Sequence, residues 1–308
     1  MPYSHHSHSG QFCKHAVGTL EDVVQEAIKQ GFEIYGLTEH VPRYRTEDLY
    51  PEEATLSLDD LTSQFDAFLA EAHRLQALYA EQITLLVGLE TEYITPLDLD
   101  KLEQLLSRSS DKVEYLVGSI HHVGGVPIDF DQNTFNKALE NSPFANNMES
   151  FLNSYFDAQL ELFQRFHPEV IGHFDLCKLY NPSLSFASFP SAWEKAKRNI
   201  RYAVDYGALF ELNAAALRKG WSSSYPAIDI VQVIQQYGGR FTLSDDSHGP
   251  HAVGLNYHRM ADYMRHAEIN ELWVLERSKT KNIGGRYVHA RKVEGDWRGH
   301  KFWTKGCS

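Results

Sequence analysis

The feature that most restricts the fold of this chain is a regular alternation of short apolar runs with longer amphipathic stretches. The apolar runs occupy residues 33–40, 83–93, 113–123, 169–176, 208–215, 240–248 and 271–277. A shorter strand is expected within residues 1–8, at the start of the chain. Most of the runs do not alternate polar with apolar residues, which is typical of parallel strands that are buried on both faces.

Helices are predicted between these strands. Thr19 is a suitable N-cap and Gly31 a suitable terminator for a helix over residues 19–31. Further helices are expected at residues 58–80, 98–107, 148–166, 190–206, 226–237 and 257–268. Because parallel strands are joined by crossover helices, this order predicts an α/β fold whose parallel sheet is either open or closed into a barrel.

The composition excludes several classes of partner. The net charge of −12 argues against nucleic acid, whose recognition needs a basic surface. No apolar run approaches the roughly 20 residues that span a bilayer, so no membrane partner is expected. The three cysteines, Cys13, Cys177 and Cys307, are too few for a disulfide framework and favour a reducing, cytoplasmic setting.

The start of the chain is rich in histidine. Residues 4–16 contain His5, His6, His8 and His15. Such a stretch is typical of a purification tag or a solvated tail, and it is also what the first part of a metal site would contain. Matching ligands elsewhere in the chain favour the metal site, because a tag needs none.

Side chains that bind metals follow most of the apolar runs. They are His6 and His8, Glu39 and His40, Glu90, His121 and His122, His173 and Asp175, Asn213, and Asp245, Asp246 and His248. In a closed barrel these strand ends meet on one face, where such folds place their chemistry. Imidazole combined with carboxylate suits Zn²⁺, Mn²⁺ or Fe²⁺. The ligands exceed what one ion needs, so two or three divalent ions are predicted, in a site that activates water for attack on phosphorus or an acyl carbon.

The motifs around these residues resemble those of the PHP (polymerase and histidinol phosphatase) family of metal-dependent phosphoesterases. They are "HSH" (His6, His8), "KHA" (His15), "TEH" (His40), "GLETEY" (Glu90), "GSIHH" (His121), "GHFD" (His173) and "SDDSH" (Asp246, His248). The segments "GLTEHVPRY", "FELNAAALRKG" and "TLSDDSH" are most similar to the stand-alone histidinol-phosphatases of the fungal type. One departure is Ser4, which stands where the family usually has an aspartate.

The resemblance implies a distorted (β/α)7 TIM-like barrel with a trinuclear metal centre at the C-terminal ends of its strands. Residues 1–278 would form this barrel, and residues 279–308, which are polar and irregular, a C-terminal extension that packs on it or trails from it. The implied ligands form three groups: His6, His8, Glu90 and Asp246; Glu90, His121 and His173; and His15, His40 and His248. His121 and Asp246 are preferred to their neighbours His122 and Asp245 because "SIH" and "D-x-H" fit the motifs better.

The resemblance further implies a phosphomonoesterase that hydrolyses a small-molecule phosphate ester, L-histidinol phosphate, in histidine biosynthesis. The candidate catalytic residues are Glu90, Asp246 and His248. The candidate phosphate ligands are Arg218, Lys178, Arg43 and Arg45, of which Arg218 is the best placed. Acidic residues of the loop at 43–53 are candidates for receiving the ammonium or imidazolium of the substrate: Glu47, Asp48, Glu52 and Glu53.

Several alternatives stay open at this point. The same residues would suit an enzyme that hydrolyses another phosphate ester, an amidohydrolase-like hydrolase or an inactivated PHP domain. The extra His15 and His40 favour phosphoester chemistry over the amidohydrolase-like alternative. Asp175 either orients a ligand or caps the following helix, and Asn213 either contacts substrate or water or is structural. The loop at 43–53 either closes over substrate or is solvated.

Overall fold

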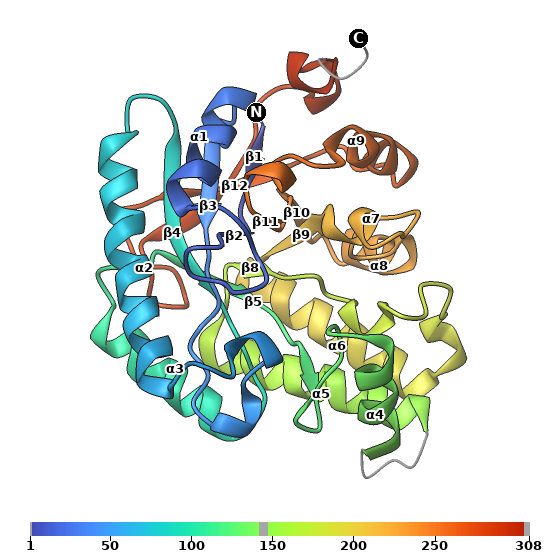
Figure 1. Ribbon diagram of the computed structural model, residues 1–308. Helices are drawn as coiled ribbons and strands as arrows, with labels where there is room; N and C mark the ends of the chain where they lie inside the picture. Colours follow the sequence, from blue (N-terminus) through green and yellow to red (C-terminus); the bar gives the residue numbers. More distant parts are fainter. Residues whose placement is uncertain (1, 142–146, 305–308) are drawn as a thin grey trace.

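The computed structural model describes residues 2–141 and 147–304. Its centre is a sheet of seven parallel strands (Figure 1). In spatial order these are β1 (Tyr3–Ser4), β3 (Ile34–Leu37), β4 (Thr84–Glu90), β5 (Tyr115–Gly118), β8 (Val170–Ile171), β9 (Leu209–Asn213) and β10 (Arg240–Ser244). The backbone N–H of His5 donates to Leu243 O at 3.2 Å, which joins the end after β1 to β10. The sheet is therefore a nearly closed barrel, and the predicted fold class is confirmed.

Helices surround this barrel on the outside (Figure 1). They are α1 (Leu20–Gln30), α2 (Leu58–Leu78), α3 (Pro96–Arg108), α4 (Gln132–Asn141), α5 (Met148–Phe166), α6 (Pro190–Tyr206), α7 (Ala215–Arg218), α8 (Ile228–Gln236) and α9 (Tyr257–His266). All seven predicted helices are present, to within two residues at each end, whereas α4 and α7 were not predicted. None of the helices in the described residues is long and apolar enough to cross a membrane.

Short elements lie between the barrel strands and helices. They are the strands β2 (Ser7–His8), β6 (His122–Val123), β7 (Val126–Pro127) and β11 (Ser247–His248), and the 3-10 helices η1 (Thr46–Asp48), η2 (Pro51–Glu53), η3 (Leu176–Lys178), η4 (Phe186–Ser188), η5 (Pro250–Ala252), η6 (Trp297–Gly299) and η7 (Lys301–Thr304).

The first helix begins and ends where local chemistry requires it. Thr19 Oγ1 accepts from Asp22 N at 3.1 Å, and Asp22 Oδ2 accepts from Thr19 N at 2.8 Å, which is a capping box. At the other end Gly31 has φ 81°, a left-handed conformation that glycine adopts without strain. The capping box at Thr19 fixes the residue at which the histidine-rich loop stops and α1 begins, so it helps to position the end of that loop.

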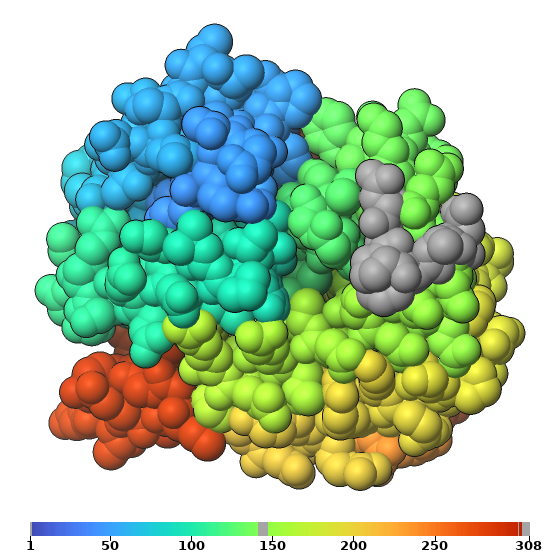
Figure 2. Space-filling model, turned by 90° about the horizontal axis from the view of Figure 1, so that it is seen from below, coloured from blue at the N-terminus to red at the C-terminus, as the bar shows by residue number. Residues whose placement is uncertain are grey.

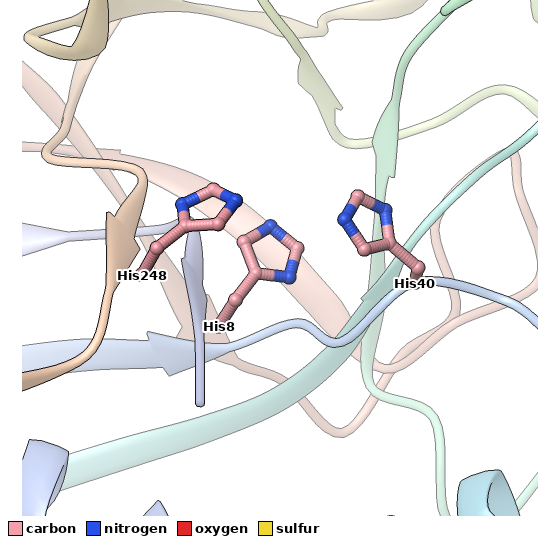
Figure 3. A group of neighbouring side chains, drawn as sticks. All are labelled: His8, His40 and His248. Carbon is pink, nitrogen blue, oxygen red and sulfur yellow. The ribbon is translucent and has the colours of Figure 1, made fainter. Parts of the chain in front are cut away.

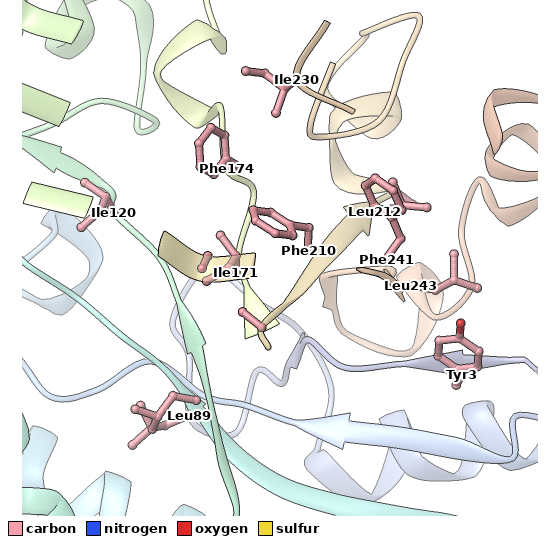
Figure 4. Close-up of a cluster of buried hydrophobic side chains, with 14 of the residues drawn as sticks. Tyr3, Leu89, Ile120, Ile171, Phe174, Phe210, Leu212, Ile230, Phe241 and Leu243 are labelled. Carbon is pink, nitrogen blue, oxygen red and sulfur yellow. The ribbon is translucent and has the colours of Figure 1, made fainter. Parts of the chain in front are cut away.

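Large apolar side chains fill the space between strands and helices (Figure 4). Inside the barrel, the Tyr115 side chain crosses the space beside β3 and β4. A Cβ at Gly36 would lie 2.0 Å from Tyr115 Oη, and one at Gly88 would lie 2.7 Å from Tyr115 Cε1. These two strands therefore need glycine where the tyrosine passes. The Tyr115 hydroxyl donates to His5 O at 2.7 Å.

After α9 the chain forms a hairpin outside the barrel. Strand β12 (Trp273–Arg277), which the sequence predicted, pairs in antiparallel register with β13 (Val288–Lys292). The latter strand lies in the segment from residue 279 that we expected to be irregular. Figure 2 shows this part of the chain in orange-red, where residues 283–286, which precede β13, lie beside α3 and the C-terminal end of α5.

His5 joins this hairpin to the barrel. Its Nε2 accepts from Leu275 N at 3.0 Å, and its Nδ1 lies 3.0 Å from Thr242 Oγ1. Burial lowers the pKa of His5 to about 3, so the ring is neutral and can accept the first of these bonds. His5 is thus a structural residue beside the candidate ligands His6 and His8, and residues 4–8 are buried rather than part of a solvated tail or tag.

Candidate metal centre

Two short strands bring histidines from opposite ends of the chain together. Strands β2 and β11 pair in parallel with His8 opposite His248, and the two ring centroids lie 4.6 Å apart. The ring of His40, which follows β3, stacks on His8 at 4.2 Å. Figure 3 shows these three rings gathered at one place. Ligand atoms of the three lie within 4.8 Å of one another, as they would around one ion.

Glu90, the last residue of β4, lies at the centre of the site. Its side chain is only 1% exposed and faces five imidazoles. The facing nitrogens are His40 Nδ1 at 2.9 Å, His173 Nε2 at 3.0 Å, His6 Nε2 and His121 Nε2 at 3.2 Å, and His8 Nε2 at 3.3 Å. Two further groups that could hold an ion share this carboxylate: His6 and His8 with Glu90, and His121 and His173 with Glu90.

Hydrogen bonding alone does not satisfy this cluster. His6 Nδ1 lies 3.1 Å from Glu211 Oε2, a carboxylate oxygen that only accepts, so Nδ1 carries a proton. In a neutral ring Nε2 then has a lone pair, and it faces Glu90 Oε1 at 3.2 Å. A lone pair and a carboxylate oxygen repel at this distance unless a proton or a metal cation lies between them.

The electrostatics of the site agree with bound cations. Although burial alone lowers the pKa of His6, the negative charges of Glu90, Asp246 and Glu211 raise it well above its ordinary value. In the group formed by His15, His40 and His248, burial lowers the pKa of His40 to about 3 and that of His15 to about 4. The raised pKa of His6 shows that the centre favours positive charge. The lowered pKa values of His40 and His15 keep these two candidate ligands neutral. The donor set therefore fits divalent ions that take nitrogen and oxygen ligands.

The structure separates the two aspartates of "SDDSH". Asp246 Oδ1 lies 3.8 Å from both His6 Nε2 and His8 Nε2, and Asn213 Nδ2 donates to its Oδ2 at 3.1 Å. Asp245 instead accepts from the hydroxyls of Ser4 and Tyr35. Ser4, at the position where the family has an aspartate, thus serves to hold Asp245.

The two histidines of "GSIHH" also separate. His121 Nε2 lies 3.2 Å from His173 Nε2 and faces Glu90, whereas His122 Nδ1 lies 3.1 Å from Glu92 Oε1. His15 lies at the outer side of the site, with its ring centroid 5.4 Å from that of His40 and 5.1 Å from that of His248. All nine expected ligands lie around one mouth of the barrel.

Three carboxylates lie behind the imidazoles. Glu211 and Glu92 had no role in the sequence analysis, and Glu39 was expected there as a metal-binding side chain. Glu211 Oε2 lies 3.1 Å from His6 Nδ1, Glu92 Oε2 lies 3.3 Å from His121 Nδ1, and Glu39 Oε2 lies 3.5 Å from His8 Nδ1. Such partners fix the ring orientation and tautomer of metal-binding histidines. A glutamate inside an apolar strand, as in "FELN", was the signal that could have identified Glu211.

Of the expected phosphate ligands, the structure brings Arg218 to the site. It lines the cavity, and its Nη1 donates to Asp246 O at 3.3 Å. Lys178 is buried elsewhere, 3.9 Å from Asp229 Oδ1. Arg43 pairs with Glu53 at 3.1 Å, and the Arg45 guanidinium pairs with Asp48. None of these three cations is among the described residues that line the cavity, and each lies beside an acidic side chain.

Asp175 and Asn213 have local hydrogen-bond roles. Asp175 Oδ2 accepts from Ala227 N at 2.9 Å, which ties the loop after β8 to the start of α8. Asn213 Oδ1 accepts from Ala215 N at 2.8 Å, and its Nδ2 also donates to Glu211 Oε1 at 2.7 Å. Asn213 therefore links Glu211 to Asp246.

The candidate metal ligands open into a cavity of about 530 Å³. Its wall also contains residues to which the sequence analysis gave no role. These are Tyr50, Asp129, Phe130, Leu176 and Tyr225. The Tyr50 and Phe130 rings stack at 5.8 Å with an interplanar angle of 13°.

Comparison with known proteins shows which family this chain resembles. The family model of the PHP domain matches residues 4–215. A probable histidinol-phosphatase from Schizosaccharomyces pombe is 47% identical over 300 residues, which cover 96% of each chain. The histidinol-phosphatase of Saccharomyces cerevisiae is 33% identical and covers 85% of this chain and 88% of its own.

A solved structure shares the fold. It is the histidinol phosphate phosphatase of Lactococcus lactis complexed with zinc, L-histidinol and phosphate, with a TM-score of 0.60 at 18% identity, covering 92% of this chain and 98% of that chain. Because the family model covers most of the chain and two relatives align over nearly its whole length, this protein belongs to the PHP domain family.

Proposed function

We propose that this protein is a metal-dependent phosphomonoesterase that hydrolyses L-histidinol phosphate to L-histidinol and phosphate, a reaction of histidine biosynthesis. The observation that carries the proposal is the convergence of five imidazoles on the buried Glu90 at the base of a cavity that also contains Arg218. The histidinol-phosphatases among its relatives support the choice of substrate. The free, buried thiols of Cys13 and Cys177 suit the reducing cytoplasm as the place of the reaction.

Two or three divalent ions, of Zn, Mn or Fe, would occupy the groups that share Glu90 and the group formed by His40, His248 and their neighbours. When bound, they would supply Lewis-acid charge stabilisation for the phosphoryl oxygens and activate water for hydrolysis. Glu90, Asp246 and His248 provide oxygen and nitrogen ligands at the cavity floor. Glu211 and Glu92 hold the rings of His6 and His121 in the orientation that this requires.

Arg218 would bind the phosphoryl group. Its guanidinium has several N–H donors in a plane, a geometry that matches phosphate oxygens. The bond from Arg218 Nη1 to Asp246 O keeps it beside the candidate ligands. Phosphoryl transfer depends mostly on positioning and charge stabilisation, so a fixed guanidinium at this place favours the reaction.

Other residues that line the cavity suit the cationic end of the substrate. Asp129 Oδ1 is buried without a hydrogen-bond partner among the described residues, and Glu52 also lines the cavity. The stacked rings of Tyr50 and Phe130 offer a flat apolar surface to an imidazole. Of the acidic residues expected for this role, Glu47, Asp48 and Glu53 instead pair with arginines of their own loop.

The proposal is tested by phosphate release from histidinol phosphate and from a phosphate ester without a cationic group. We expect kcat/KM to be at least about a hundredfold higher for histidinol phosphate, because a site built around polar groups discriminates strongly. Chelation should abolish the activity, and added Zn²⁺ or Mn²⁺ should restore it. Equal rates on both esters would remove the substrate assignment, and hydrolysis of amides or lactones without phosphate release would favour the amidohydrolase alternative.

Asp129→Asn is expected to raise KM for histidinol phosphate by about tenfold to a hundredfold, since a hydrogen bond to a charged group contributes about 1.5–3 kcal/mol. The change keeps the shape of the side chain and removes its charge. The same variant should hydrolyse the ester without a cationic group as well as the unmodified protein does. Steady-state kinetics on both esters measure the effect, and an equal loss on both would contradict the role of Asp129.

A further inference from the structure

A cysteine lies beside two of the candidate metal ligands. Cys13 Sγ is 3.2 Å from His15 Nε2, and the side chain is buried. Ligand atoms of Cys13, His15 and His40 all lie within 4.8 Å of one another. His40 also belongs to the group with His8 and His248, so the thiol extends that group on its outer side.

The loop around Cys13 is held in a defined position. Cys13 N donates to Ser9 O at 2.9 Å, and both Ser9 N and Ser9 Oγ donate to Glu39 Oε1. Val17 N donates to His248 O at 3.1 Å, which fastens the end of the loop to the metal centre. A Cβ at Gly10 would lie 2.6 Å from Val17 Cα, so the loop folds tightly on itself. The backbone of Cys13 is therefore held next to the candidate ligands by hydrogen bonds of its own loop.

The distances agree with a shared ion. Zinc binds thiolate at about 2.3 Å and imidazole nitrogen at about 2.0–2.1 Å in tetrahedral geometry, which separates the two ligand atoms by about 3.5 Å. The separation of 3.2 Å between Cys13 Sγ and His15 Nε2 is close to this value. A hydrogen bond between the thiol and the ring, which would only orient His15, has a similar length and is the alternative to be tested.

We propose that Cys13 binds, as a thiolate, the divalent ion that His15 and His40 hold, and that the third position of the metal centre is a mixed sulfur and nitrogen site. The thiol proton leaves to solvent when the ion binds. A thiolate ligand favours zinc over manganese at this position, because soft ligands select softer ions. The inference rests on the proposed metal centre.

Cobalt(II) provides a direct test, because a cobalt–thiolate bond gives a charge-transfer band in the near ultraviolet that imidazole and carboxylate ligands do not give. The full-length protein, freed of metal and titrated with Co²⁺, should show this band. Cys13→Ser should lose the band and keep the visible d–d bands of bound cobalt. Metal affinity alone would not separate the roles, since loss of a residue that only orients a ligand also lowers affinity by about tenfold to a hundredfold.

The other two cysteines serve as matched controls. Cys177 is buried in the hydrophobic core, and Cys307 lies outside the described residues. Cys177→Ala and Cys307→Ser should both keep the charge-transfer band. Bound cobalt without the band in the unmodified protein, or a band that persists in Cys13→Ser, would overturn the inference while leaving the phosphatase activity in place. Failure to bind cobalt at all would overturn the metal centre and the proposed function with it.

Discussion

Glu90→Gln is expected to lower kcat/KM for histidinol phosphate by at least about a thousandfold. The substitution removes a negative charge that two candidate metal groups share. Charge stabilisation by a metal centre contributes several kcal/mol, and each factor of ten in rate corresponds to about 1.4 kcal/mol. The fold should persist, because the backbone bonds of Glu90 to Glu39 and Val41 do not involve its side chain. Kinetics and metal analysis of the purified variant measure the effect.

A matched control is Glu194→Gln on α6. That side chain is 73% exposed and pairs with Lys197 one helical turn away, so neither activity nor metal content should change. If Glu90→Gln kept its metal and lost less than tenfold in kcat/KM, Glu90 would not be the centre of the catalytic site. Circular dichroism of both variants separates loss of chemistry from loss of fold.

Arg286→Ala is expected to lower the free energy of unfolding by about 3–5 kcal/mol, because removal of one partner of a buried ion pair leaves the other charge without compensation. Arg286 Nε donates to both carboxylate oxygens of Glu169, at 2.6 and 2.8 Å, and both side chains are less than 10% exposed. Arg286 Nη2 also donates to Phe166 O and His167 O, each at 2.8 Å. Denaturation by urea measures the effect.

The same segment supplies the control for this prediction. Arg291 on β13 pairs with Glu276 on β12, and both side chains are about half exposed, so Arg291→Ala should change the free energy of unfolding by less than about 1 kcal/mol. We expect both variants to retain kcat under native conditions, since neither residue lines the cavity. Equal stability of the two variants would mean that residues after 278 contribute little to the barrel.

The secondary structure could be predicted wherever local signals agree. Thr19 with Asp22 and Gly31 mark the ends of α1, and the apolar run ending at Glu90 marks β4. Strand β13 was not predicted because its sequence, "VHARK", is polar and only one of its five residues is buried. It is a strand because β12 lies beside it, and a contact between distant segments leaves no local pattern.

The strand ends gave a first list of candidate ligands, because parallel strands end on the same side of a barrel. The resemblance to the PHP motifs then implied which of these side chains, together with His15, would meet around Glu90. Cations could not be placed in this way. Arg43 and Arg218 both follow barrel strands, yet Glu53 holds the first away from the cavity and only the second lines it.

The hydrophobic pattern by itself determined an α/β fold with a parallel sheet and its order of strands and helices, and the resemblance of the motifs to the PHP family implied the closed barrel and the set of ligands. The motifs already favoured His6, His121 and Asp246 as ligands. Only the tertiary structure decided what their neighbours contact instead: His5 accepts from Leu275 N, His122 lies beside Glu92, and Asp245 accepts from Ser4 and Tyr35. It also decided that Glu211 orients His6 and that Cys13 lies beside His15. The reason is physical. Strand and helix formation depend on local periodicity, whereas the direction and partner of a polar side chain depend on which distant groups compete for its hydrogen bonds and charge.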